Sequence, residues 1–205
     1  MDKTLLILLG LLAAVGAAVF ILLPGGAPAT PATSGAAVVR TSAALPSVDG
    51  VIKPGEYSGK TVVGDVEVNW ATEKNALRVG LVSPGTGWVA IGLDPQSMMD
   101  KANIILGAVV SGAVVARDDV GTGLFSHAPD TSVGGQDNLL AAAGREVDGK
   151  TMFEFAIPLN SGDATDRPLA IGQTVKIIVA YQTTSDDFAE RHSRRASGEI
   201  TLGTL

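Results

Sequence analysis

Two histidines and a pair of adjacent methionines are the side chains of this chain best suited to hold a metal-containing cofactor. The histidines are His127 and His192, the adjacent methionines are Met98 and Met99, and Met152 is the remaining methionine after the initiator. Methionine normally fills apolar cores, so a pair in a polar stretch between apolar runs is unusual. Imidazole and thioether groups both ligate haem iron. Several Met/His pairs are therefore open as a ligand set.

The composition excludes several other kinds of site. The chain has no cysteine, which removes disulfides, thiolate-held zinc, iron–sulfur clusters and covalently attached c-type haem. A net charge of −6 argues against nucleic-acid binding. The acidic residues show no paired arrangement for hydrolysis, and neither histidine is tied by sequence to a nucleophile, so we expect no enzyme. The doublets Asp118-Asp119 and Asp186-Asp187 are either calcium ligands or solvated turn residues.

The candidate ligands fall in three polar stretches between apolar runs. Met98 and Met99 lie between predicted strands at 88–93 and 102–107, in the sequence GWVAIGLDPQSMMDKANIILG. Residues 118–136 hold His127, and residues 183–197 hold His192. Long loops on a rigid scaffold commonly carry binding residues. We expect these three loops to meet at one end of the domain.

Residues 48–202 as a whole have the pattern of an antiparallel sheet protein. Apolar and polar residues alternate in VEVNW (66–70) and in LRVGL (77–81), as in half-buried strands. Ser111-Gly112 and Asp148-Gly149 each separate two apolar runs and predict hairpin turns. Residues 175–181 form the most continuous apolar strand, which we expect to be central, and 199–202 close the sheet. The fold class is all-β, an antiparallel β-sandwich of immunoglobulin-like type, over residues 46–205.

The first 26 residues predict a membrane anchor or a signal segment. Thr4 to Leu23 contains no charge and no proline, and a helix of that length spans about 30 Å, the thickness of a bilayer core. A signal peptide is the alternative, although its apolar region is usually shorter. Lys3 precedes the apolar run and favours an exported C-terminal domain. Residues 27–45, rich in Ala, Pro and Thr, predict a flexible linker.

Several segments together resemble the DOMON family. These are GWVAIGLDPQSMMDKANIILG, RDD, SHAPDT, GGQDNLL, DGKTMFEFAIPL and AYQTTSDDFAERHSRRASGEITL, in that order over about residues 48–202. The resemblance implies a β-sandwich of the kind found in extracellular redox proteins. Some members bind one b-type haem through an axial Met and an axial His, some are not known for haem, and related sandwiches bind sugars.

The resemblance also implies which residues hold the haem b. The axial Met of the haem-binding members falls on Met99 and the axial His on His192, with Met98 and His127 as the alternatives. Ligation by Lys53 or Lys101 is a weaker possibility. Next to an axial His192, three arginines suit haem propionates, since guanidinium matches carboxylate geometry: Arg191, Arg194 and Arg195. Without haem they are a solvated basic run, and Trp88 is either a core residue or a haem contact.

The expected function is therefore an exported, membrane-tethered b-type cytochrome domain that transfers electrons. Its partners would be the cell membrane and a redox protein, such as a membrane oxidoreductase or cytochrome. If the N-terminal segment is cleaved, the domain is secreted. The alternatives are a carbohydrate-binding or adhesion module and a haem-free accessory subunit of a membrane complex. A sugar-binding sandwich generally needs exposed aromatic side chains, and aromatics are only 4% of this chain.

Overall fold

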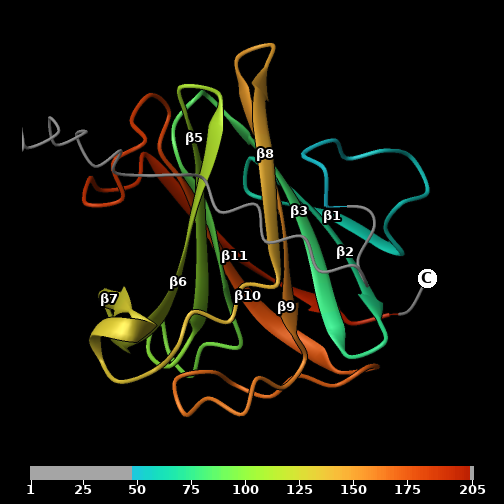
Figure 1. Cartoon of the computed structure of the whole chain (residues 1–205), viewed down its shortest axis with the longest axis vertical. Coiled ribbons are helices and arrows are strands. Elements are labelled where there is room, and N and C mark those ends of the chain that lie inside the picture. The colour runs from blue at the N-terminus through green and yellow to red at the C-terminus, as the bar shows by residue number, and fades with distance from the viewer. Residues whose placement is uncertain (1–47, 204–205) are drawn as a thin grey trace, which may run out of the picture. The chain divides into compact units, whose positions relative to one another are not determined.

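The computed structural model describes residues 48–203 and folds them into two antiparallel β-sheets (Figure 1). The five-stranded sheet has the order β1 (Gly59–Val63), β2 (Val66–Glu73), β3 (Ala76–Pro84), β9 (Lys150–Pro158) and β8 (Ala141–Val147). The six-stranded sheet has the order β11 (Arg194–Thr201), β10 (Thr174–Tyr181), β4 (Val89–Leu93), β5 (Asn103–Val110), β6 (Ala113–Gly123) and β7 (Ser126–Pro129). A short 3₁₀ helix, η1 (Asp130–Ser132), follows β7. The all-β sandwich prediction is confirmed.

The predicted anchor or signal segment at 1–26 and the linker at 27–45 lie outside the described residues. Within residues 48–203, no helix is long and apolar enough to cross a bilayer.

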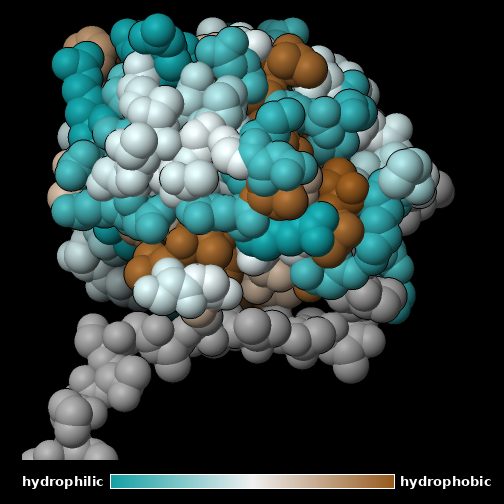
Figure 2. All heavy atoms as spheres, turned by 90° about the horizontal axis from the view of Figure 1, so that it is seen from above, coloured by the Kyte–Doolittle hydropathy of each residue, from teal (hydrophilic) through white to brown (hydrophobic). Residues whose placement is uncertain are grey.

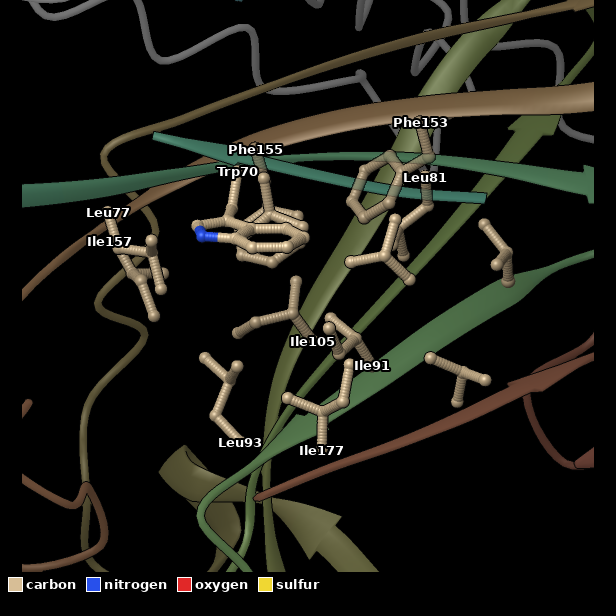
Figure 3. Close-up of a cluster of buried hydrophobic side chains, with 14 of the residues drawn as sticks. Trp70, Leu77, Leu81, Ile91, Leu93, Ile105, Phe153, Phe155, Ile157 and Ile177 are labelled. Carbon is tan, nitrogen blue, oxygen red and sulfur yellow. The ribbon is translucent and has the colours of Figure 1, made fainter. Parts of the chain in front are cut away.

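The core is formed where the inner faces of the two sheets meet. Figure 3 shows Trp70, Phe153 and Phe155 of the five-stranded sheet facing isoleucines of the six-stranded sheet. These isoleucines are Ile91, Ile105 and Ile177, each at most 1% exposed. The rings of Phe153 and Phe155 are stacked, with their centroids 5.5 Å apart. Alternate residues of each strand point into this core, as the period-two pattern predicts.

Both predicted hairpin turns are present. Ser111 and Gly112 have φ values of 53° and 79° between β5 and β6, and Asp148 and Gly149 have 52° and 70° between β8 and β9. Two successive residues with positive φ match the right-handed twist of the flanking strands, which is why turns of this kind end in glycine. These turns place β5 beside β6 and β8 beside β9.

Three details of the sequence prediction are wrong. Residues 118–136 are not one loop, because β6 continues to Gly123 and pairs with β7, which contains His127. The 183–197 loop ends earlier than predicted, because Arg194 already begins β11. The apolar strand β10 is not central, since it lies second from the edge, between β11 and β4.

The first described segment covers the outer surface of the five-stranded sheet at Glu154. The carboxylate of Glu154 accepts hydrogen bonds from the backbone N–H groups of Gly50 (2.6 Å) and Val51 (3.0 Å) and from the hydroxyl of Tyr57 (2.6 Å). Glu154 is therefore fully buried although it lies on the strand face opposite the core phenylalanines. Figure 2 shows that apolar side chains on the face in view form separate patches among polar ones.

Candidate cofactor-binding face

The six-stranded sheet is apolar on its outer face as well as on its inner face. The residues that form this outer face come from β4, β5 and β10 and from the connections on either side of them. Its buried members are Trp88, Ala90, Ala102, Ile104, Leu106 and Ala108, and its partly buried members are Met99, Ile178, Ala180 and Phe188. Antiparallel sheets commonly have one face in water, whereas the buried members of this second face are at most 6% exposed. We call this set of residues the outer face.

The middle of the outer face combines small and branched apolar residues. Ala90 pairs with Ala180 and Leu106, and Gly92 pairs with Ile178 and Ile104. A Cβ atom at Gly92 would lie 2.7 Å from Cγ1 of Ile178, so even a methyl group there would displace that side chain. An apolar surface of this kind suits contact with an apolar ligand.

The two adjacent methionines have different surroundings. Met98 is 40% exposed and has a φ of 55°, whereas Met99 packs against the outer face. The backbone around Met99 is held in place, because its carbonyl accepts from the N–H of Ala102 (3.0 Å) and its N–H donates to the carbonyl of Leu124 (3.3 Å). Of the two sulfurs, that of Met99 belongs to the side chain on the outer face.

His192 lies in the connection between β10 and β11, which extends over part of the outer face. The carbonyl of Ser185 accepts from the N–H of Trp88 (2.9 Å), and Phe188 packs on the outer face. His192 is half-buried, and burial together with the charges of Arg191 and Arg195 lowers the pKa of its imidazole. A neutral imidazole at neutral pH is the form that binds a metal.

His127 is held by a different set of contacts, at the edge of the outer face. Its Nδ1–H donates to Oδ2 of Asp119 over 2.5 Å, and Arg117 donates to both oxygens of the same carboxylate over 2.6 and 2.7 Å. Burial opposes ionisation of Asp119, but the hydrogen bonds from His127 and Arg117 hold its pKa below the ordinary value. The guanidinium of Arg117 also lies 5.1 Å from the ring centre of Phe188. The hydrogen bond of His127 thus crosses the β6–β7 hairpin to Asp119.

The loops that carry the candidate ligands do not all meet at one end of the sandwich. Tyr181, at the start of the His192 connection, pairs with Val89, whereas Ile177 pairs with Leu93, at the start of the methionine loop. The two loops therefore leave opposite ends of β4 and approach the outer face from opposite directions (Figure 1). His127 lies at the methionine end, because its register partner Gly121 donates its N–H to the carbonyl of Ala102.

The three arginines near His192 lie on different sides of the sheet. Arg195 pairs with Ala180 and shares its face, which is the outer face. Arg194 pairs with Tyr181 and lines a small hollow next to Asp65, toward the other sheet. Arg191 is exposed in the connection. Successive side chains of a strand start toward opposite faces, although atoms of both Arg194 and Arg195 line the hollow.

The indole of Trp88 is buried at the outer face, with 5% of its surface exposed. Its Nε1–H has no hydrogen-bond acceptor among the described residues. Buried indole N–H groups usually have a partner, so an acceptor from a bound group would complete this site. Trp70 is also buried, and Phe125, at 75%, is the one aromatic side chain of residues 48–203 that is mostly exposed. These positions provide no aromatic platform for a sugar.

Arg117 is a functional candidate that the sequence interpretation missed, and Asp119 was considered only as a calcium ligand or a turn residue. Both lie in β6, two residues apart and on one face, because Leu106 pairs with Arg117 and Ile104 with Asp119. Val115, Arg117 and Asp119 are two residues apart, which is the spacing of side chains on one face of a strand. This spacing was overlooked because the adjacent aspartates Asp118 and Asp119 are typical of turns.

Comparison with known proteins places this fold in a family. A model of the DOMON domain matches residues 62–182. The cytochrome b domain of pyranose dehydrogenase from Coprinopsis cinerea is similar at 12% identity, covering 66% of this chain and 76% of that one, with a TM-score of 0.48. The cytochrome domain of cellobiose dehydrogenase from Myriococcum thermophilum is similar at 11% identity, covering 67% and 74%, with a TM-score of 0.47. Because the DOMON match spans more than half of the chain, this protein belongs to the DOMON family.

Proposed function

We propose that this protein is a b-type cytochrome domain that binds one haem on the outer face and transfers electrons. The observation that carries the proposal is the outer face itself, an apolar surface that holds Met99 and is partly covered by the connection containing His192. Membership of the DOMON family supports an electron-transfer or binding module and not a catalytic domain.

The residues on the outer face fit a haem. Met99 supplies a thioether and His192 a neutral imidazole, both of which ligate haem iron without any cysteine. Met99 and His192 would hold the group from two loops that leave opposite ends of β4. The unpartnered Nε1–H of Trp88 is a donor available to a bound polar group.

Each residue has a distinct role in this proposal. The side chains of Ile178, Ala180 and Phe188 exclude water from the macrocycle. Arg195, which shares the outer face, and Arg191, in the exposed connection, would pair with propionates, whereas Arg194 lines the hollow beside Asp65. When bound, a haem with two protein ligands supplies reversible one-electron exchange and leaves no iron position open for oxygen.

Residues 4–23 complete the proposal as a membrane tether. Their apolar sequence is long enough to span a bilayer. A tether of this kind would raise the concentration of the domain near a membrane oxidoreductase or cytochrome, its proposed redox partner. If the segment is cleaved instead, the same domain acts as a secreted cytochrome.

Paired substitutions at the four candidate ligands test the assignment. The full-length protein is produced with haem supplied, and the haem content and the low-spin absorption spectrum are measured. Met99→Ala and His192→Ala should each lose the low-spin spectrum, whereas the matched controls Met98→Ala and His127→Ala should keep it. If His127→Ala loses the spectrum and His192→Ala does not, the nitrogen ligand is His127. A wild-type protein without a low-spin b-type spectrum would overturn the function itself.

A further inference from the structure

Three carboxylates lie together away from the outer face, at the end of the sandwich that contains the methionine loop. Asp118 comes from β6, Asp130 begins η1, and Asp166 lies in the connection between β9 and β10. Their ligand oxygens all lie within 4.8 Å of one another. Asp118 is 3% exposed and Asp130 is fully buried. We call Asp118, Asp130 and Asp166 the carboxylate cluster.

The cluster contains buried oxygens that lack hydrogen bonds of normal geometry. These are Oδ1 of Asp118 and both oxygens of Asp130. Buried polar atoms are nearly always partnered, so three unpartnered oxygens at one point require an explanation. The opposite oxygen of Asp118 does accept a bond, from the backbone N–H of Asn138 over 2.8 Å. The carboxylates are thus anchored while part of their oxygen surface is left open.

An uncharged side chain provides an independent indication of a ligand. Asn103, 6% exposed, donates through Nδ2 to Oδ1 of Asp166 over 2.6 Å, which places its carboxamide against the cluster. Its own carbonyl oxygen, Oδ1, is buried and has no hydrogen-bond donor. The buried hydroxyl of Thr165, the residue before Asp166, lies beside the carboxylates of Asp130 and Asp163. The amide oxygen of Asn103 and the three carboxylates form a set made up only of oxygen ligands.

No positive side chain within residues 48–203 forms an ion pair with the cluster. Arg117 is bound to Asp119, and Arg167, which follows Asp166 directly, is bound to Asp94 over 2.6 Å. The neighbouring charged residues that act on the cluster are themselves acidic, namely Asp119, Asp137 and Asp163. Buried carboxylates without a counter-charge are costly, and a bound cation would remove that cost.

We propose that Asp118, Asp130, Asp166 and the carbonyl oxygen of Asn103 bind one calcium ion. Calcium prefers carboxylate and carbonyl oxygens in an irregular arrangement of six to eight ligands, with water supplying those that the protein does not. The absence of histidine and thiolate from this set argues against zinc and copper. Such an ion would hold β6, η1 and the β9–β10 connection together. The proposal does not depend on haem.

Calcium titration of the purified full-length protein, stripped with a chelator, tests the site. Isothermal titration calorimetry at neutral pH should give one calcium ion per chain, and calcium should raise the melting temperature. Asp130→Asn and Asp166→Asn should each weaken binding at least about tenfold, because calcium affinity follows the charge of its ligands. Asp148→Asn is the matched control, since it removes one carboxylate from the exposed β8–β9 turn and should bind as the wild type does.

Two results would overturn the proposal. One is the absence of both heat and a melting shift at about 10 mM calcium, tenfold above the weakest affinities usual for extracellular modules. The other is binding that Asp130→Asn and Asp166→Asn leave unchanged. If Asp130→Asn does not fold, two other variants decide the question: Asp166→Asn, at a partly buried position, and Asn103→Ala, which leaves the net charge unchanged. Each is expected to weaken calcium binding.

Discussion

Arg117, Asp119 and His127 form a chain of charge-assisted hydrogen bonds at the edge of the outer face. The carboxylate of Asp119 is fully buried, and both of its oxygens accept bonds of 2.7 Å or less. Bonds of this kind are stronger than those between neutral groups. Asp119 therefore sets the orientation of both the His127 ring and the Arg117 guanidinium, which lies over Phe188.

Removing the Asp119 carboxylate should destabilise the protein measurably. We expect Asp119→Ala to lower the free energy of unfolding by about 2 kcal/mol, because Arg117 and His127 are left with unsatisfied donors. Urea unfolding followed by circular dichroism measures the change. Asp148→Asn, in an exposed turn whose positive φ asparagine also tolerates, should change stability by less than about 0.5 kcal/mol. If Asp119→Ala lowers the free energy of unfolding no more than the control does, these hydrogen bonds make no net contribution to stability.

At the scale of elements, β4, β5 and β10 have to be apolar on both faces. Their inner residues form the core, and their outer residues form the outer face, where Gly92 provides no side chain. This double burial explains why the stretch around the methionine loop has nearly continuous apolar strands instead of alternating ones.

Adding a methyl group at Gly92 tests whether the lack of a side chain there is needed for stability and for haem binding. A Cβ there would lie 2.7 Å from Ile178, so we expect Gly92→Ala to cost about 1–3 kcal/mol and to lower haem content. Gly203→Ala is the control, because its Cβ would meet its nearest neighbour, Ser58, at an ordinary 3.8 Å. Stability comes from urea unfolding and haem content from absorbance. Full haem content in Gly92→Ala would contradict a ligand that lies on this surface.

The sequence was sufficient to predict most strands and two hairpin turns, but not the contacts that bring the site residues together. The Ser111-Gly112 and Asp148-Gly149 turns were predictable because their residue types match positive φ values. The extension of β6 was not, since Asp118 is hydrogen-bonded by Asn138, twenty residues further on, and Asp119 by His127 of the neighbouring strand. Likewise, no local pattern indicates that Asp166 meets Asp118. Such contacts depend on the tertiary fold, which local propensity does not encode.

At the scale of the whole molecule, the carboxylate cluster makes stability depend on pH. Burial raises the pKa of Asp118 to about 8 and that of Asp130 to about 6. The unfolded chain ionises these groups near pH 4, so between that pH and about 8 the folded state holds the extra protons. A state that binds more protons loses relative stability as protons become scarce. Without a cation, the folded state should therefore become less stable as pH rises.

Unfolding in the presence of a chelator tests this dependence. The free energy of unfolding of the full-length protein should fall between pH 5 and about pH 8, and Asp130→Asn should flatten the fall because it removes one titrating group. Asp148→Asn should retain the wild-type slope. A wild-type stability that rises with pH across this range would contradict the raised pKa values.

The central claim of this account is that the outer face binds haem between a thioether and an imidazole. The most direct measurement is the dithionite-reduced minus oxidised absorption spectrum of the full-length protein, purified after production with haem supplied. We predict the sharp bands of a low-spin, six-coordinate b-type haem, with one haem per chain. A colourless protein, or one whose haem is high-spin, would contradict the claim.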